Sequence, residues 1–191
     1  MSDTLFHAPA EALALPPLAA AGTSLHRAGP LVRFVFRGDA GAAAKAGEAF
    51  GVSLPQTPLA AGRAGDRAAL WQGPDEWLLL ARPAADGPQA VDGLARSLAG
   101  ELAAVLGDTP HSLVDVSERN IALLLEGPGV ADLLNAHVFL DLDPVAFPVG
   151  MVTRTLFTKA EIVLWRTGSD RFVLECWRSF APYVEGLLAE G

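Results

Sequence analysis

The chain has 191 residues, 51% of them hydrophobic and 19% charged, and its formal net charge is −8. This length suits one full core, or two small subdomains that share one, and the composition excludes a disordered chain. The negative charge argues against nucleic acid as a partner, since affinity for phosphates comes mainly from Lys and Arg.

Membrane and secreted classes are also disfavoured. No apolar run approaches the roughly 18 to 20 residues that span a bilayer. The first residues lack the basic start and apolar core of a signal peptide, and the lone Cys176 excludes an internal disulfide framework and Cys-based metal clusters. A cytoplasmic protein is therefore expected. The mean hydropathy of +0.31 is high and has two readings that stay open: apolar surface buried against a partner, or an Ala-rich composition without functional meaning.

The first half of the chain begins with an arm. Residues 1–29 are rich in Ala, Leu and Pro and are expected to be extended, either disordered or laid across a surface. The pattern that follows predicts a strand at 31–36, a helix at 40–50, strands at 68–71 and 77–80, and a helix from Pro88 to near Gly107. The expected core face of that last helix is Leu94, Leu98, Leu102, Val105 and Leu106.

The second half repeats this order. It predicts a short strand at 113–116, a strand at 121–125, a helix at 130–136, strands at 152–157, 162–165 and 172–174, and a final helix. Ser179 is expected to cap the final helix. Its expected core face is Phe180, Tyr183, Val184, Leu187 and Leu188.

Two similar phrases make the repeat visible. Leu70-Trp71 leads into a Gly-Pro-Asp turn and Leu164-Trp165 into a Gly-Ser-Asp turn, and each turn is followed by an apolar strand. Trp71 and Trp165 are therefore expected at corresponding positions. Each half reads as β-α-β-β-α, and tight Gly-Asp turns favour antiparallel hairpins. The prediction is an α+β fold in which residues 30–191 form a single domain of two pseudo-repeats, 30–107 and 112–191, with antiparallel sheets packed on helices.

The residues between the two copies resemble a known family. Asp115-Val116-Ser117, a strand, Gly127-Pro128-Gly129 and a helix ending in Leu133-Leu134 resemble the opening of the aminomethyltransferase fold, the folate-binding fold of the glycine cleavage T-protein. Residues 73–79 and 154–165, with Arg178-Ser179-Phe180-Ala181, resemble the gamma subunits of heterotetrameric sarcosine oxidases. That similarity runs from about Ala28 to the C-terminus.

The resemblance implies a complex of alpha, beta, gamma and delta chains. Such a complex oxidises the N-methyl group of sarcosine, giving glycine, hydrogen peroxide and, with tetrahydrofolate, methylenetetrahydrofolate. The resemblance also implies that FAD, FMN, NAD and tetrahydrofolate are bound by the large chains and no cofactor by this one. The expected partners are the alpha, beta and delta subunits, without nucleic acid or membrane.

The sequence departs from the catalytic T-protein where folate binds. Ala160 and Glu161 occupy the positions of an Asp-Asp pair, and Glu175-Cys176-Trp177 stands in place of Val-Asn-Ala. Trp177 is expected to fill the folate pocket. Glu161 is the one residue that could still hold a folate amine, and no catalytic residue is expected in this chain.

Other candidate groups have plainer readings. The histidines at positions 7, 26, 111 and 137 lack the spacing of metal ligands. Cys176 is expected to be a buried thiol rather than a nucleophile. Asp115, Ser117 and Arg119 suggest a triad, but a turn held by Ser and Asp, with Arg119 paired to a carboxylate, is favoured.

The remaining motifs are also read as structural. Gly127-Pro128-Gly129 before a helix could cradle a phosphate, yet it lacks the Lys of a P-loop. Asp75 and Asp170 are assigned to turns. The four tryptophans, at 71, 77, 165 and 177, are assigned to core or interface packing.

Two functions remain in competition. The first is a structural, non-catalytic subunit of a flavin-dependent amine oxidase, so that the chain contributes to an enzyme without supplying its chemistry. The second is a free-standing folate-binding protein of the aminomethyltransferase family, acting in methyl-group transfer or iron–sulfur assembly. The first is favoured, because the late Lys-Gly-Cys-Tyr-type motif of the assembly factors and the C-terminal barrel of the methyltransferases are both missing from this sequence.

Overall fold

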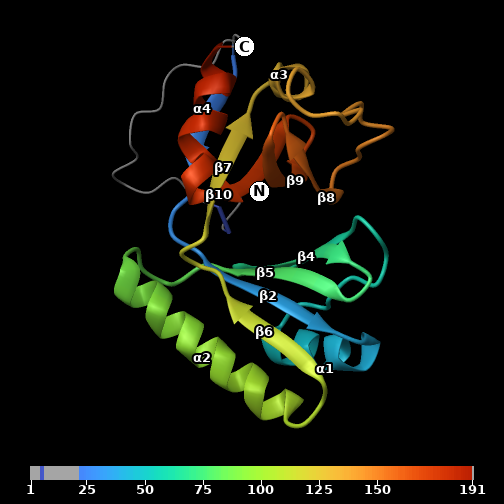
Figure 1. Ribbon diagram of the computed structural model, residues 1–191, viewed down its shortest axis with the longest axis vertical. Coiled ribbons are helices and arrows are strands. Elements are labelled where there is room, and N and C mark those ends of the chain that lie inside the picture. Colours follow the sequence, from blue (N-terminus) through green and yellow to red (C-terminus); the bar gives the residue numbers. More distant parts are fainter. Residues whose placement is uncertain (1–4, 7–21, 191) are drawn as a thin grey trace. The chain divides into compact units, whose positions relative to one another are not determined.

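The computed structural model describes residues 5–6 and 22–190, and their contacts divide the chain into two compact units. Unit 1 holds residues 5–6 and 29–117, and unit 2 holds residues 22–28 and 118–190. Each unit is a five-stranded sheet with two helices (Figure 1). Of the predicted N-terminal arm, residues 1–4 and 7–21 lie outside the described residues.

The sheet of unit 1 has the strand order β3-β4-β5-β2-β6, and all its neighbouring strands are antiparallel. In chain order the elements are β2 (Val32–Gly38), α1 (Ala40–Phe50), β3 (Ala61–Ala64), β4 (Arg67–Gly73), β5 (Glu76–Ala81), α2 (Pro88–Leu106) and β6 (His111–Asp115).

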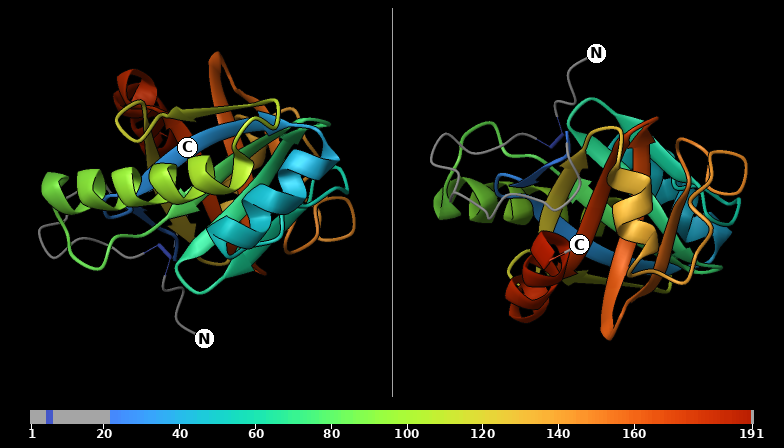
Figure 2. Two further views of the ribbon diagram at one scale, coloured as in Figure 1. Left: turned by 90° about the horizontal axis from the view of Figure 1, so that it is seen from below. Right: turned by 90° about the horizontal axis from the view of Figure 1, so that it is seen from above.

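Both helices of unit 1 cover the same face of its sheet (Figure 2). Asp39 caps α1 by accepting a hydrogen bond from the backbone N–H of Ala42 at 2.8 Å, and Gly51 ends the helix at φ 75°. The side chains of α1 that face the sheet are mostly alanines, so the helix backbone can approach Phe34, Phe36 and other core side chains closely.

Unit 2 is built on the same plan, with the strand order β1-β7-β10-β9-β8. In chain order its elements are β1 (Ser24–Arg27), β7 (Asn120–Glu126), α3 (Val130–Asn135), β8 (Val152–Phe157), β9 (Ala160–Gly168), β10 (Arg171–Trp177), a 3₁₀ turn (Arg178–Phe180) and α4 (Ala181–Glu190). The helices α3 and α4 lie on one face of the sheet (Figure 2). Their apolar residues belong to a single core cluster with residues of the strands.

The predicted repeat is confirmed at the level of topology. The order β3-β4-β5-β2 in unit 1 corresponds to β8-β9-β10-β7 in unit 2, with α1 and α3 at the same step. The two hairpin turns also make the same contact. The N–H of Gly38, at the end of β2, donates to the carbonyl of Asp75 at 3.1 Å, and the N–H of Gly127, after β7, donates to the carbonyl of Asp170 at 2.9 Å. Asp75 and Asp170 thus lie in turns, as expected.

The fifth strand of each sheet was not assigned correctly from the sequence. Residues 111–115 form β6, which pairs with β2 in unit 1, whereas the sequence predicted a strand at 113–116 that opens the second repeat. Residues 24–27 form β1, which pairs with β7, whereas the sequence placed them in the arm. Pairing between strands so distant in sequence leaves no local pattern. That the two units form a single domain stays a prediction.

The two tryptophans of the repeated phrase lie in equivalent strands but on opposite faces. Trp71 in β4 packs against the core beneath the helices. In β9 it is Leu164 that belongs to the corresponding core, and Trp165 is buried on the other face of the sheet. The expected residue-level match is therefore wrong by one position, and a one-residue offset turns every side chain of a strand to the opposite face.

Three predicted core residues on the helices are exposed. Val105 on α2 is 47% exposed, Phe180 at the end of the 3₁₀ turn is 37% exposed, and Tyr183 in the first turn of α4 is 38% exposed. The buried positions of α4 include Glu185, so its core face is rotated from the predicted one. Ser179 lies inside the 3₁₀ turn rather than at the cap of α4. No helix among residues 5–6 and 22–190 is long and apolar enough to cross a membrane.

Candidate functional site

Asp115 and Ser117 form a closed turn at the end of β6. One carboxylate oxygen of Asp115 accepts hydrogen bonds from the Ser117 N–H at 2.9 Å and from the Ser117 hydroxyl at 2.6 Å. The hydroxyl oxygen in turn accepts from the Arg33 N–H at 3.0 Å. Because the hydroxyl donates to a carboxylate and its oxygen is held by a backbone donor, it has a structural role. The predicted turn reading fits this geometry.

Arg119 takes part in a small aromatic surface of unit 2. Its guanidinium lies 5.8 Å from the ring centroid of Trp177, and its Nε donates to the side-chain oxygen of Asn120 at 3.1 Å. The expected partner was a carboxylate. Trp177 also packs on Phe180, with 6.3 Å between the ring centroids. Trp177 is 44% exposed. That its side chain takes the place of a folate pocket stays a prediction.

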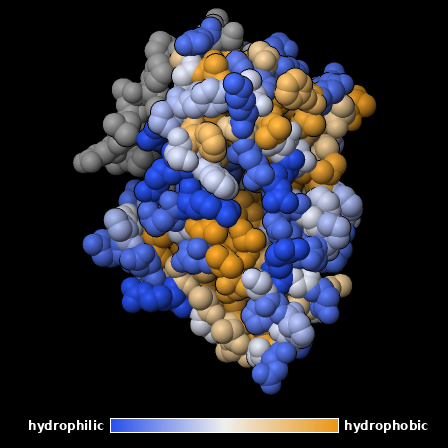
Figure 3. Space-filling view, viewed as in Figure 1, coloured by the Kyte–Doolittle hydropathy of each residue, from blue (hydrophilic) through white to orange (hydrophobic). Residues whose placement is uncertain are grey.

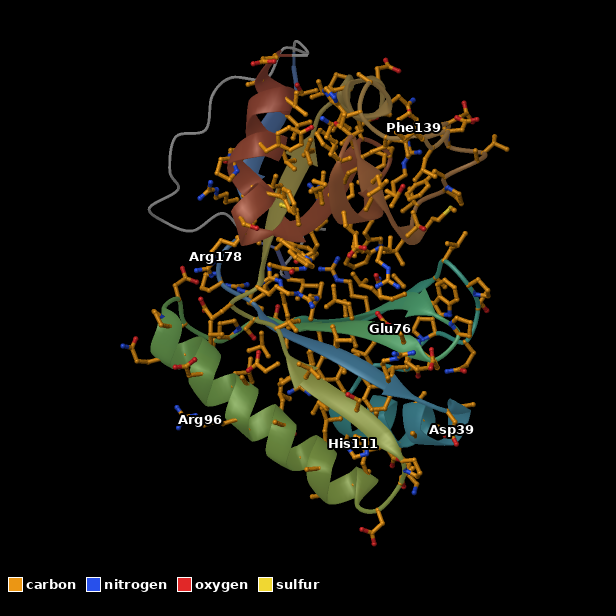
Figure 4. The ribbon with its side chains drawn as sticks, viewed as in Figure 1. Asp39, Glu76, Arg96, His111, Phe139 and Arg178 are labelled. Carbon is orange, nitrogen blue, oxygen red and sulfur yellow. The ribbon has the colours of Figure 1, made fainter. Side chains whose placement is uncertain are left out.

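Beside this aromatic surface an exposed ion pair joins Arg178 to Glu118, with 2.9 Å between Nη2 and Oε2 (Arg178 is labelled in Figure 4). Exposed pairs of this kind contribute little stability. The pair adds charge of both signs to the surface around Trp177.

The other two residues of interest from the sequence have opposite environments. Glu161, at the start of β9, is exposed and lies across from Leu156 of β8. Cys176 is 1% exposed and belongs to the apolar core of unit 2. A thiol surrounded by apolar side chains is a poor nucleophile, because burial disfavours the thiolate.

The described histidines are dispersed over the two units. His26 is exposed on β1, and the Nδ1 of His111 lies 2.7 Å from the carbonyl oxygen of Thr109. His137 packs on Phe157 with 4.7 Å between the ring centroids, and burial lowers its pKa while a hydrogen bond with the backbone of Leu187 opposes the shift. Within residues 5–6 and 22–190, no three His, Cys, Asp or Glu side chains are placed to hold a metal ion.

The Gly127-Pro128-Gly129 motif forms a backbone turn after β7 and is not arranged to bind a phosphate. The Gly127 N–H already donates a hydrogen bond to the carbonyl oxygen of Asp170, and Pro128 has no N–H to donate. Gly127 adopts φ 127°, and a Cβ at this position would collide with the carbonyl oxygen of Gly22. A glycine is required here because the backbones of β1 and β7 meet at this point.

A shallow groove runs beside α1 in unit 1, with a volume of about 580 Å³. Glu48 is the one ionisable residue in its lining. Small apolar side chains and backbone make up most of the remainder, so the groove offers no pair of groups for acid–base chemistry. Its lining is Ala40, Ala43, Ala44, Gly47, Glu48, Gly51, Val52, Ser53, Leu54 and Gln56.

The sequence analysis did not identify two arginines that hold parts of unit 2 together. Arg27 of β1 donates two hydrogen bonds to the carboxylate of Glu185 of α4, from Nε to Oε1 at 2.6 Å and from Nη2 to Oε2 at 2.8 Å. The pKa of Arg27 is raised by its hydrogen bond to Glu185, which outweighs the effect of burial. The two residues are 158 positions apart, and neither stands in a recognisable motif.

The second missed residue is Arg166 of β9, which is 3% exposed. Its guanidinium donates to the carbonyl oxygens of Leu142 at 3.1 Å, Phe147 at 2.9 Å and Ser169 at 2.5 Å. It also lies over the ring of Phe172. A charged residue in the middle of an apolar strand was the available signal, because such a residue is seldom buried without several partners.

Residues 37–190 match the family described as sarcosine oxidase, gamma subunit family. A curated relative, sarcosine oxidase subunit gamma from Corynebacterium sp. (strain P-1), is 36% identical over 77% of this chain and 67% of its own length. The chain spans 60 to 67% of the length of the curated relatives it matches.

Two solved structures resemble the fold. A chain of the heterotetrameric sarcosine oxidase from Corynebacterium sp. U-96, solved in complex with pyrrole 2-carboxylate, has a TM-score of 0.77 and 28% identity over 91% of this chain and 86% of that one. The glycine cleavage system aminomethyltransferase T from Bartonella henselae has a TM-score of 0.62 and 15% identity over 88% of this chain and 45% of that one. At that identity the second match supports the fold alone, and it agrees with the expected aminomethyltransferase-like architecture.

Proposed function

The chain belongs to the sarcosine oxidase gamma subunit family, and we propose that it serves as the structural, non-catalytic gamma subunit of a heterotetrameric sarcosine oxidase. The complex would oxidatively demethylate sarcosine to glycine, with hydrogen peroxide and methylenetetrahydrofolate as further products. The alpha, beta and delta subunits are its proposed partners. FAD, FMN, NAD and tetrahydrofolate are assigned to the larger subunits, and the complex to the cytoplasm.

The family match over residues 37–190 carries this proposal. A non-catalytic role is supported by what the candidate groups do in the fold. The Ser117 hydroxyl is engaged by Asp115 and by a backbone N–H, and Cys176 is packed among apolar side chains. Both groups would have to leave these environments before they could act as nucleophiles.

The competing function, a free-standing folate-binding protein, receives less support. Its fold is shared, but the match to the aminomethyltransferase is 15% identical and bears on architecture only. Glu161, the one residue proposed to hold a folate amine, has an exposed side chain. An exposed carboxylate binds a ligand amine weakly, because water screens the charge and competes for the hydrogen bond.

Co-expression with the other three chains of the oxidase tests both halves of the proposal. With a tag on this chain, the purified material should contain all four chains and should oxidise sarcosine. The amount of complex and the turnover per flavin are measured separately. Glu161→Ala and Cys176→Ser are expected to leave turnover per flavin within about twofold of the unmodified complex.

The possible failures have different meanings. A tagged chain that purifies alone, beside an active complex of the others, refutes the subunit role. Full assembly with a tenfold or greater loss of turnover in the Glu161 variant, on the order of 1.4 kcal/mol, means that this chain takes part in the chemistry. Micromolar folate binding to the isolated chain, weakened by Glu161→Ala, would favour the competing function.

A further inference from the structure

The segment between α3 and β8, residues 137–151, exposes large apolar side chains to an unusual degree. Phe139 is 86% exposed, Val145 92% and Val149 58%. We call this segment the apolar loop. Figure 4 labels Phe139 on it, and Figure 3 shows apolar side chains gathered over this part of unit 2. Single exposed apolar residues are ordinary on a protein surface, whereas several on one short segment mark an interaction site.

The apolar loop is nevertheless anchored in the core of unit 2. Val138, Leu142 and Phe147 are buried, at 5%, 0% and 1% exposure, and alternate along the loop with the exposed residues. Phe147 also stacks on Phe172 of β10, with 6.3 Å between the ring centroids. The exposed side chains therefore project from a segment whose neighbouring residues are fixed.

Hydrogen bonds hold the backbone of the apolar loop in one shape. Asp141 accepts through its side chain from the N–H of Asp143 at 2.9 Å, and Asp143 accepts in the same way from the N–H of Val145 at 2.8 Å. These are two successive Asx turns. Arg166, in the neighbouring strand β9, donates hydrogen bonds to the carbonyl oxygens of Leu142 and Phe147. Burying a guanidinium is costly unless it is well paired. The Arg166 guanidinium finds its partners in the loop backbone, so it stabilises one conformation of the loop.

A rigid loop with exposed apolar side chains has the properties of a binding surface. Its conformation does not have to be ordered when a partner binds, and this lowers the entropic cost of association. Covering exposed Phe and Val side chains with another surface is favourable, because apolar area is removed from water. In a protein without a partner, these side chains would stay exposed to water and contribute no such stabilisation.

The charge of the loop narrows the identity of the partner. Asp141 and Asp143 are exposed beside the apolar side chains, and residues 137–151 contain no Lys or Arg. A second copy of this chain would bring the same carboxylates together, in a protein whose net charge is already −8. An anionic membrane surface would also repel them. The complementary surface is apolar at its centre with Lys or Arg at its edge.

We propose that the apolar loop is a preformed docking surface, through which this chain binds an apolar, basic-edged patch on another subunit of the oxidase complex. Phe139, Val145 and Val149 are the side chains covered in the complex, and Asp141 and Asp143 meet the basic edge. This inference rests on the proposed subunit role and specifies which surface carries it out.

A competition experiment in the assembled complex tests the proposal. Unmodified and variant chains with different tags are co-expressed with the other oxidase subunits, and mass spectrometry measures their ratio in the purified complex. Phe139→Lys and Val145→Lys place an unpaired positive charge in the contact and are each expected to be incorporated at least about tenfold less than the unmodified chain. Val105→Lys on α2 is the matched control and is expected to compete within about twofold.

The charge argument has its own variants. Asp141→Asn and Asp143→Asn keep the side-chain oxygens that accept the turn hydrogen bonds and remove only the charge. Each is expected to reduce incorporation by about two- to fivefold, as fits a charge at the edge of an interface. Circular dichroism and the soluble level of every variant confirm that each is folded.

The outcomes separate the two proposals. Absence of the unmodified chain from the complex refutes the subunit role, and the docking surface with it. Incorporation of the Phe139 and Val145 variants at the level of the Val105 control overturns the docking surface and leaves the subunit role intact. Dimers of the isolated chain that Val145→Lys dissociates, with incorporation unchanged, would instead assign the loop to a second copy. Higher incorporation of the Asp→Asn variants overturns the basic edge.

Discussion

The Arg27–Glu185 pair gives a prediction about stability that depends on which partner is removed. Glu185 is 6% exposed, whereas the side chain of Arg27 is 34% exposed. Arg27→Ala leaves a carboxylate in a largely apolar site between β1 and α4, and breaking a fully buried pair in this way costs about 3–5 kcal/mol. The space left by Arg27 opens toward solvent, so we expect about 2 kcal/mol. For a chain of this size that loss lowers the Tm by about 4–8 °C.

The opposite substitution should be milder. Glu185→Met replaces the carboxylate with an apolar side chain of similar length, and the partly exposed Arg27 can be hydrated. We expect a cost of about 1 kcal/mol or less. Because the double variant has no buried charge left without a partner, it should recover at least about half of the stability that Arg27→Ala loses.

Thermal and urea unfolding of the purified variants, followed by circular dichroism, give these differences. The reasoning is refuted if Arg27→Ala unfolds within about 1 °C of the unmodified chain. It is also refuted if the double variant is as unstable as Arg27→Ala, since the loss would then not come from the carboxylate.

Three further predictions follow from single residues. Arg166→Met removes the guanidinium that donates to four carbonyl oxygens and should cost about 2–4 kcal/mol, with faster hydrogen exchange in residues 137–151. Unchanged exchange in that segment would contradict the role of the guanidinium. Gly127→Ala should lower the Tm far more than Gly65→Ala, because a Cβ at position 127 meets backbone while one at 65 meets nothing within 4 Å, and equal shifts would be evidence against that close contact. Burial lowers the pKa of His137 below its ordinary value of 6.5, so its protonation is disfavoured in the folded state. The contribution of His137 to stability should therefore be constant well above pH 6.5 and fall as the pH drops below it. His137→Gln should remove this part of the pH dependence, measured as the Tm difference between pH 7.5 and 5.5 (about one pH unit on either side of the ordinary His pKa).

Local signals in the sequence predicted the elements that depend on neighbouring residues. The helix α1 was predicted at residues 40–50, its observed bounds, and the structure shows the local reason: Asp39 caps it and Gly51 ends it. Pro88 likewise fixed the start of α2. In each case the informative residue lies within one turn of the boundary, so the interaction that decides the structure is visible in a short window of sequence.

The errors arose where a residue from a distant part of the chain decides the outcome. The core face of α4 was read from apolar spacing, but Glu185 is turned inward because Arg27, in a strand far earlier in the sequence, holds it there. The shape of the apolar loop likewise depends on a residue of another element, Arg166 of β9. Spacing identifies apolar residues but not the polar ones that a distant partner allows to be buried.

The way this chain uses its polar groups bears on the kind of protein it is. Catalytic sites hold ionisable groups accessible to substrate and unsatisfied by the fold. In the described part of this chain, three charged groups with clear partners act within the fold: Arg27 joins β1 to α4, Arg166 binds the backbone of a loop, and Asp115 closes a turn. Large apolar side chains, among them Phe139 and Val145, are exposed to solvent as well. This distribution of charged and apolar side chains agrees with the proposal that the chain binds another subunit.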